Sequence, residues 1–499
     1  MLQSTVDINF IINLFSAENI KAAFSYSFNK PWFFTEFSFL FVFGFFLIIY
    51  SFIVEKNKWK NVYIILFSLF FYYKSSGPFL GLFILMIISD YFFARYIANQ
   101  EGLKKKLLLY LSLVYSLSFL LYFKYSDFVV LNLNQFAGTH FALNNLFLPI
   151  GISFYTFQSI SYLVDVYRNE LAPTKRFSDY AFYMTFFPHL VAGPIVRAKD
   201  FLPQIASPNI IDSRLYKESI LRILMGLMKK LFIADYLGKY VTILHATPNG
   251  FSGFEHFMSM YAYSFQIYFD FSGYSDIAIG IALLLGYRLK DNFDGPYLAS
   301  NITIFWRKWH ISLSNWLKDY IYIPLGGSRH GVFKTYLFLL ITMLIGGFWH
   351  GADWRFMFWG LAHGLALVLH KIWSTYIKIN PKNMLFSFLG VVLTFNFVSI
   401  CWIFFRSSSF EIAFESIHSI FTKINFLEAY TFTMARPEIT ILILISMAIV
   451  FTPFKVKNFL IEKSYKLPAF TYIILITLTL QLIIQFKDDL IQPFIYFQF

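Results

Sequence analysis

Residues 336–351 read Tyr-Leu-Phe-Leu-Leu-Ile-Thr-Met-Leu-Ile-Gly-Gly-Phe-Trp-His-Gly, an apolar run that ends beside a single titratable side chain, His350. Similar runs follow one another along the 499-residue chain, which is 58% hydrophobic, 22% aromatic and only 14% charged. A soluble protein of this length would need a much larger polar surface. The sequence therefore predicts an all-α membrane protein that crosses the bilayer many times.

The candidate spans extend over most of the chain. Some, such as 61–74 and 336–350, are shorter than the roughly 20 residues that a perpendicular helix needs. We therefore expect about ten to twelve crossings plus re-entrant helices, all within one integral-membrane domain over residues 1–499. The candidate stretches are 32–54, 61–74, 77–98, 105–125, 145–167, 177–196, 219–246, 255–287, 336–350, 354–376, 384–405, 439–454 and 467–485.

Two segments differ from simple spans. In 407–425 the apolar residues recur at helical spacing, which predicts an amphipathic helix in the membrane interface, followed by C-terminal helices over 439–485. The segment 301–330 mixes an aromatic stripe with charged residues and ends in Pro324, Gly326 and Gly327. Such a segment must lie at an interface or line a watered cavity.

The formal charge of +13 is spread over basic positions that punctuate the apolar runs, such as 104–106 and 229–230. This spacing fits loops and helix ends beside anionic lipids, whereas nucleic-acid footprints are contiguous. We therefore expect contact with membrane lipids and none with nucleic acid. The single cysteine, Cys401, excludes an internal disulfide, and we expect no metal site.

Polar groups at membrane depth are costly when unpaired, so polar residues inside apolar runs mark candidate sites. Asp270 and Asp276 lie inside the stretch 255–287, and we expect both to be paired or to face water. The segments 148–159 and 187–195 each contain helix-breaking prolines, and kinked helices are the simplest explanation for them.

Two tryptophan–histidine dipeptides, Trp309-His310 and Trp349-His350, are the strongest candidates for chemistry. Histidine can accept and return a proton near neutral pH. An imidazole beside an indole is also a common way to pack a core, so packing stays open as the alternative.

Small residues flank one of these dipeptides. Gly347 and Gly351 lie beside His350 and would let helix backbones approach closely. We assign His363 and His370, on the following stretch, to packing or interfaces.

Several enzyme classes lack their motifs in this sequence. It contains no G-x-S-x-G elbow, no H-E-x-x-H motif and no Walker A loop, so serine hydrolase, zinc protease and ATP-driven activities are not expected. Group transfer by a histidine base, or transport, remains. For transport, the inverted-repeat halves of many carriers are not evident.

The chain resembles the membrane-bound O-acyltransferase (MBOAT) family, and within it the bacterial alginate O-acetylase branch. The resemblance is carried first by Arg307-Lys308-Trp309-His310-Ile311-Ser312-Leu313-Ser314-Asn315-Trp316 and by Gly347-Phe348-Trp349-His350-Gly351. It covers roughly residues 30 to 410 in the expected order, with core motifs over about 145–405. Further matching segments are 150–157, 191–195, 270–276 and 401–406.

This resemblance implies a ring of transmembrane and re-entrant helices around a thin centre, with a tunnel from a cytoplasmic donor side to an outer acceptor side. It implies that His350 is the catalytic histidine and that His310 is the second signature position. We expect His310, with an indole N–H, to orient the donor or stabilise the developing oxyanion. The residues expected to bind substrate are Trp309, Trp316, Trp349, Asp270 and Ser312.

The implied reaction is transfer of an acyl group, here expected to be acetyl, from a thioester to a hydroxyl of an exported polysaccharide. The donor would be acetyl-CoA or a loaded carrier protein, with no bound cofactor, and the acceptor could be reached through an extracytoplasmic partner acetyltransferase. The implied location is a bacterial inner membrane. Two alternatives stay open: D-alanyl transfer from a carrier-protein thioester to teichoic acid, and a polytopic transporter or flippase.

Overall fold

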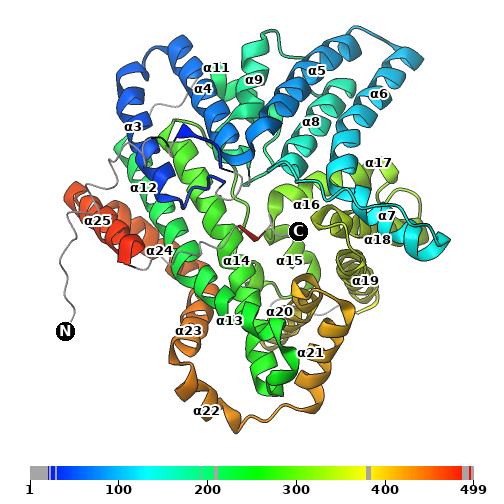
Figure 1. Cartoon of the computed structure of the whole chain (residues 1–499), viewed down its shortest axis with the longest axis vertical. Coiled ribbons are helices and arrows are strands. Elements are labelled where there is room, and N and C mark those ends of the chain that lie inside the picture. Colours follow the sequence, from blue (N-terminus) through cyan, green and yellow to red (C-terminus); the bar gives the residue numbers. More distant parts are fainter. Residues whose placement is uncertain are drawn as a thin grey trace. The chain divides into compact units, whose positions relative to one another are not determined.

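The structure is a computed structural model that describes residues 21, 24–27, 31–191, 193–206, 212–377, 384–485 and 494–495. Throughout these residues the regular structure is helical, with no strand, as the sequence predicts (Figure 1). The chain divides into two compact units, each described below by itself. Unit 1 comprises Met1–Leu120, Phe147–Val191 and Arg197–Ser207, and unit 2 comprises Leu121–Leu146, Ala192–Val196 and Pro208–Phe499.

Unit 1 has an aromatic core. The ring of Phe187 lies 5.0 Å from the ring of Phe67 and 5.7 Å from that of Phe71, and all three side chains are buried. The helices of this unit are α3 (Phe37–Ile53), α4 (Asn57–Ser76), the 3-10 turn η1 (Gly77–Phe79), α5 (Leu80–Ala98), α6 (Gly102–Leu120), α8 (Ile152–Tyr167), α9 (Phe177–Thr185), α10 (Phe187–Leu190) and α11 (Ala198–Ala206).

Two predicted spans of this unit fold as shorter helices. In 145–167, α8 begins only at Ile152, because Pro149 precedes it and Gly151 is left-handed, with φ +80°. The backbone is crowded there, since a Cβ on Gly151 would lie 2.7 Å from the Leu190 carbonyl oxygen. In 177–196, α9 ends at Thr185 and α10 restarts with a proline in its first turn, so the predicted interruption near Pro188 is confirmed. Pro149 instead precedes α8 and does not kink it.

Unit 2 holds every residue expected to be catalytic or to bind substrate. Its N-terminal elements are the π-helical turn η2 (Leu121–Tyr125), α7 (Ser126–Ala137), α12 (Ser213–Leu227), the π-helical turn η3 (Met228–Ala234), α13 (Asp235–Ala246), η4 (Pro248–Gly250) and α14 (Gly253–Leu284). The segment 301–330 is broken into short helices, and η5 (Pro296–Leu298) precedes it. These helices are α15 (Ile302–Lys308), α16 (Ile311–Leu317), η6 (Lys318–Tyr322) and α17 (Ile323–Leu325). The remaining helices are α18 (Val332–His350), α19 (Trp354–Tyr376), α20 (Met384–Arg406), α21 (Phe410–Thr422), α22 (Glu428–Ala435), α23 (Pro437–Phe451), α24 (Phe454–Tyr465) and α25 (Ala469–Gln485).

The 32-residue helix α14 is the central helix of unit 2. It starts with a capping box, in which Ser252 Oγ accepts from the Glu255 backbone N–H and the Glu255 carboxylate accepts from the Ser252 N–H. It packs against α12 where a Cβ on Gly226 would lie 2.5 Å from the Gly273 carbonyl oxygen. This close approach requires glycine on both helices.

The predicted total of about ten to twelve crossings is not confirmed. Within the described part of the chain, six helices are long and apolar enough to cross a membrane, or up to eight if two pairs bent by 104° and 111° each count as one span. The total is lower because 177–196 breaks into short helices, while 61–74 and 77–98 join into one helix, Trp59–Ala98. The stretch 219–246 lies in a continuous helical run, α12–η3–α13, but Arg222, Lys229, Lys230 and Asp235 make it too charged to count as an apolar span. The other five are Gly102–Ala137, Gly253–Leu284, Val332–His350, Trp354–Tyr376 and Met384–Arg406.

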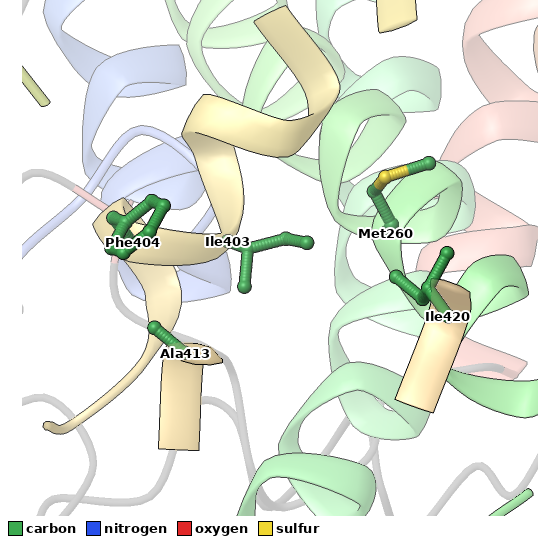
Figure 2. Close-up of a cluster of buried hydrophobic side chains, with 5 residues drawn as sticks. All are labelled: Met260, Ile403, Phe404, Ala413 and Ile420. Carbon is green, nitrogen blue, oxygen red and sulfur yellow. The ribbon is translucent and has the colours of Figure 1, made fainter. Parts of the chain in front are cut away.

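The predicted amphipathic helix of 407–425 forms as α21, with Ser409 as its N-cap. Part of its apolar face packs inside unit 2. Ala413 and Ile420 join a buried cluster with Met260 of α14 and with Ile403 and Phe404 of α20 (Figure 2). The rest of the stripe is exposed, with Phe414 at 54% and Phe421 at 68%. An amphipathic helix held on one side by protein can offer its other apolar side to lipid, and its place in the membrane interface stays a prediction.

Candidate active site

His350 is the last residue of α18, at the point where α18 turns back into α19. The two helices approach through glycines, as predicted for Gly347. A Cβ on Gly347 would overlap the Phe356 carbonyl oxygen and lie 3.1 Å from the Cα of Gly360. A Cβ on Gly360 would in turn overlap the Met343 carbonyl oxygen. Close backbone contact of this kind is typical of small residues at membrane helix interfaces. It fixes the end of α18 firmly against α19.

The imidazole of His350 is 4% exposed and surrounded by aromatic rings. Its ring centroid lies 5.0 Å from Trp349, 5.2 Å from Trp359 and 5.3 Å from Phe405, all at steep angles. An apolar shell of this kind excludes water from the imidazole. This helps a reaction in which water would otherwise compete with the intended nucleophile.

His310 is fully buried and adopts a left-handed backbone, with φ 41° and ψ 57°, at the N-cap of α16. Such a conformation costs about 1–3 kcal/mol in a residue other than glycine and often marks a functional position. Burial lowers the pKa of His310 to about 3, so its ring is neutral at neutral pH.

The side chain of Asn292 sets the tautomer of His310. Its Oδ1 accepts from the Ser312 backbone N–H at 3.2 Å and from the Ser312 hydroxyl at 2.9 Å. A backbone N–H can only donate, so this atom of Asn292 is the oxygen. The same oxygen lies 3.2 Å from His310 Nδ1, which must therefore carry the proton. The neutral ring then has its lone pair on Nε2.

We predict that Asn292→Leu destabilises the protein by about 1–3 kcal/mol, because it leaves buried donors of His310 and Ser312 without their acceptor. Asn292 is only 1% exposed, so water cannot replace its oxygen. The measurement is the melting temperature of detergent-purified protein, with Asn249→Leu in an exposed turn as control. Equal melting temperatures for the two variants would contradict the role of Asn292.

The indole of Trp349 joins the two candidate histidines. Its ring lies 5.0 Å from His350 and 6.2 Å from His310. The tertiary structure thus brings together the two dipeptides, which lie 40 residues apart in the sequence. Trp349 is the side chain through which the two dipeptides meet.

The other expected substrate-binding residues have structural partners. Trp309 is 1% exposed and packs on Trp402 at 5.1 Å. Trp316 packs on Tyr320 at 5.2 Å. The Ser312 hydroxyl, which donates to Asn292, also accepts from the Ile195 N–H at 3.0 Å. Their roles toward substrate stay predictions.

Both aspartates of α14 are paired, as the cost of burying a lone carboxylate predicts. Asp270 Oδ1 lies 2.5 Å from Lys230 Nζ, and its Oδ2 accepts from the Ile495 N–H at 2.9 Å. Asp276 Oδ2 lies 2.5 Å from Lys229 Nζ. The lysines come from the π-helical turn η3, so consecutive residues of one turn neutralise both carboxylates.

His363 packs on Trp359, the indole that also packs on His350, whereas His370 lies about two turns further along α19. His363 is fully buried on α19 and packs against Trp359 at 4.7 Å and Trp306 at 5.2 Å. His370 Nδ1 lies 2.9 Å from the Thr303 hydroxyl. These contacts agree with the packing role expected for both. No group of three His, Cys, Asp or Glu side chains that could hold a metal occurs among the described residues.

Three residues of the site were missed in the sequence. Asn292 lies in a loop with no distinguishing pattern, and Trp359 is one of many aromatic residues. Lys124 did carry a signal, because it interrupts the apolar stretch 105–125 and charges at such positions need a partner. Its ammonium donates to the backbone carbonyls of Trp349 and His350.

One known protein family has a model that matches most of this chain. The model of the membrane-bound O-acyltransferase family, MBOAT, matches residues 67–414, which include both dipeptides. The chain belongs to the MBOAT family. This MBOAT protein is therefore an O-acyltransferase with several membrane spans, and the transporter alternative is set aside.

Named relatives of this MBOAT protein carry two kinds of name. A probable alginate O-acetylase of Pseudomonas aeruginosa is 39% identical over 377 residues, 74% of this chain and 71% of the relative. A peptidoglycan O-acetyltransferase of Helicobacter pylori is 38% identical over 429 residues, 81% of each chain. A teichoic acid D-alanyltransferase of Streptococcus thermophilus is more distant, at 29% identity over 54% of this chain and 69% of the relative.

Proposed function

We propose that this MBOAT protein transfers an acetyl group from a thioester to a hydroxyl of an exported polysaccharide, with His350 as the general base. The observation that carries the proposal is the buried imidazole of His350 beside the indole that also contacts His310. The names of its relatives support acetyl as the acyl group and a polysaccharide or peptidoglycan chain as the acceptor.

The proposed reaction is direct. His350 takes the proton of the acceptor hydroxyl while the oxygen attacks the thioester carbonyl. A carbon–oxygen bond forms, the carbon–sulfur bond breaks, and the proton on the imidazole passes to the leaving thiolate. The products are an O-acyl ester and a free thiol, so no cofactor and no redox step are required. The aromatic shell of His350 would limit hydrolysis of the thioester.

His310 would orient the acceptor rather than stabilise the oxyanion. Its proton lies on Nδ1, toward Asn292, so Nε2 of the neutral ring can accept a hydrogen bond but cannot donate one. The proton of the attacking hydroxyl goes to His350, so this lone pair would accept from a second hydroxyl of the polysaccharide and hold the acceptor in place. The oxyanion would then be stabilised by N–H donors such as the indole of Trp349, Trp309 or Trp316.

We place the protein in the cytoplasmic membrane of a bacterium, with the thioester donor on the cytoplasmic side and the acceptor, or an extracytoplasmic partner acetyltransferase, on the other. Several apolar helices and the bacterial relatives support this placement. A thioester such as acetyl-CoA is made in the cytoplasm, whereas exported polysaccharide lies outside. Transfer between them needs a protein that spans the bilayer.

The deciding experiment offers two donors to the purified protein in liposomes. One is labelled acetyl-CoA, and the other is a carrier protein loaded with labelled D-alanine; alginate and peptidoglycan fragments serve as acceptors. We expect label to move from acetyl-CoA to a polysaccharide hydroxyl, with one thiol released per ester formed. Transfer of D-alanine from the carrier protein, with acetyl-CoA left intact, would overturn the acetyl assignment and favour the D-alanyl alternative.

A further inference from the structure

The C-terminal end of α18, which carries His350, is capped by two side chains from η2. Lys124 Nζ donates to the carbonyl oxygen of Trp349 at 2.7 Å and to that of His350 at 2.9 Å. The hydroxyl of the next residue, Tyr125, donates to the Phe348 carbonyl oxygen at 2.9 Å. Three successive carbonyls of one helix end are thus bound by two successive residues that lie more than 220 positions earlier in the chain.

This cap answers a specific need of α18. The last four carbonyls of any helix lack partners inside the helix, and a left-handed glycine often helps to satisfy them. Gly351 is instead extended, with φ −160° and ψ 150°. Buried carbonyls without partners are costly, and a cation is favoured at the negative end of the helix dipole. The Lys124 ammonium supplies both the hydrogen bonds and the charge.

The π-helical form of η2 is itself informative. A π-helical turn inserts an extra residue into a helix, and such turns occur frequently at functional sites. Here the turn ends with Lys124 and Tyr125, and both side chains contact the same helix end. The ring of Tyr125 also lies 4.4 Å from that of Phe348, so the segment is anchored by packing as well as by hydrogen bonds.

We propose that Lys124 is a positioning residue for the reaction: by holding the carbonyls of Trp349 and His350, its ammonium fixes the direction in which the imidazole meets the acceptor hydroxyl. The Lys124 ammonium also lies 5.9 Å from the Trp349 ring centroid, so one group restrains both the indole and the backbone of its neighbour. This inference rests on the proposed role of His350 as general base.

The test compares Lys124→Met, Lys124→Arg and Lys104→Met in full-length protein. Methionine keeps the length and removes the donors, arginine restores charged donors, and Lys104 is an exposed lysine on the same apolar helix, Gly102–Ala137. We expect Lys124→Met to lower kcat about 10- to 100-fold with little change in KM, because the cost falls on orientation in the transition state. Lys124→Arg should recover most of the loss, and Lys104→Met should match wild type.

A merely structural cap would give a different pattern. Lys124→Met would then have a lower melting temperature, but its folded fraction would keep the wild-type kcat, and this result would overturn the proposal. If Lys124→Met does not accumulate, Tyr125→Phe serves in its place, since it removes one hydroxyl and keeps the ring. We expect about a 3- to 10-fold lower kcat for it, and an unchanged kcat in folded Tyr125→Phe protein would count against positioning.

The double variant Lys124→Met with His350→Ala separates this inference from the proposed function. If Lys124 acts through His350, the second substitution adds little to the loss caused by His350→Ala alone. Full additivity of the two losses would overturn positioning while leaving His350 as the base. A near wild-type rate for His350→Ala itself would overturn the proposed function, and the positioning role with it.

Discussion

The His350→Ala variant is expected to fold and to lose a factor of about 10² to 10⁴ in kcat, which is the usual contribution of a general base. The loss arises because the rings that surround the imidazole, those of Trp349, Trp359 and Phe405, cannot take the proton of the acceptor hydroxyl. The measurement is thiol release from labelled acetyl-CoA at saturating acceptor, together with the melting temperature of the purified protein.

The matched control for this variant is His140→Ala, because His140 is exposed and the same imidazole is removed there. Its rate and melting temperature should equal those of the wild type. A His350→Ala protein that melts normally and still transfers acyl groups at nearly the wild-type rate would show that the base lies elsewhere. His310, whose Nε2 carries the lone pair of a neutral ring, would then be the next candidate.

The Gly347→Ala variant is expected to lose about 1–3 kcal/mol or more of stability, and with it most of the folded protein. A Cβ there would come closer than 3.0 Å to the backbone of α19 at Phe356, and a backbone atom cannot turn aside as a flexible side chain can. Helices α18 and α19 would have to separate, which also loosens the packing of His350 against Trp359. The measurement is the melting temperature and the yield of monodisperse protein in detergent.

Gly81→Ala is the control for this substitution. Gly81 is also a glycine within a long apolar helix, α5, but nothing lies within 4 Å of the place where its Cβ would be. Alanine is the better helix former by up to about 1 kcal/mol, so this variant should be as stable as the wild type or more so. A tolerated Gly347→Ala protein would mean that α18 and α19 can pack further apart than the structure has them.

Hydropathy alone gave a good account of the class of fold. The long apolar stretches 354–376 and 384–405 became α19 and α20 with almost the same bounds. Each is long enough to span the hydrocarbon core as one helix, and an apolar helix is stable there against either lipid or protein. It was also predictable that Asp270 and Asp276 would each have a charged partner, because an unpaired carboxylate inside an apolar helix is too costly.

Hydropathy was less reliable where backbone geometry decides the outcome. The stretches 145–167 and 177–196 are apolar enough to be spans, yet α8 begins only after Gly151, and α9 ends at Thr185, three residues before Pro188. Hydropathy averaged over a stretch of residues does not show where a proline or a left-handed glycine interrupts the helix. The stretches 61–74 and 77–98 show the opposite case, because they were predicted as two separate spans and the helix continues between them through a short 3-10 turn that contains Pro78.

The sequence by itself determined that this protein is helical, lies in a membrane and carries a histidine at the end of an apolar helix beside a glycine pair. These properties depend on composition and on the order of neighbouring residues, so they do not change with the path of the rest of the chain. Only the tertiary structure decided that Asn292 fixes the tautomer of His310 and that Lys124 caps the helix end at His350. A hydrogen-bond partner is chosen by the path of the whole chain, so two residues 226 positions apart can share one bond that neither segment predicts alone.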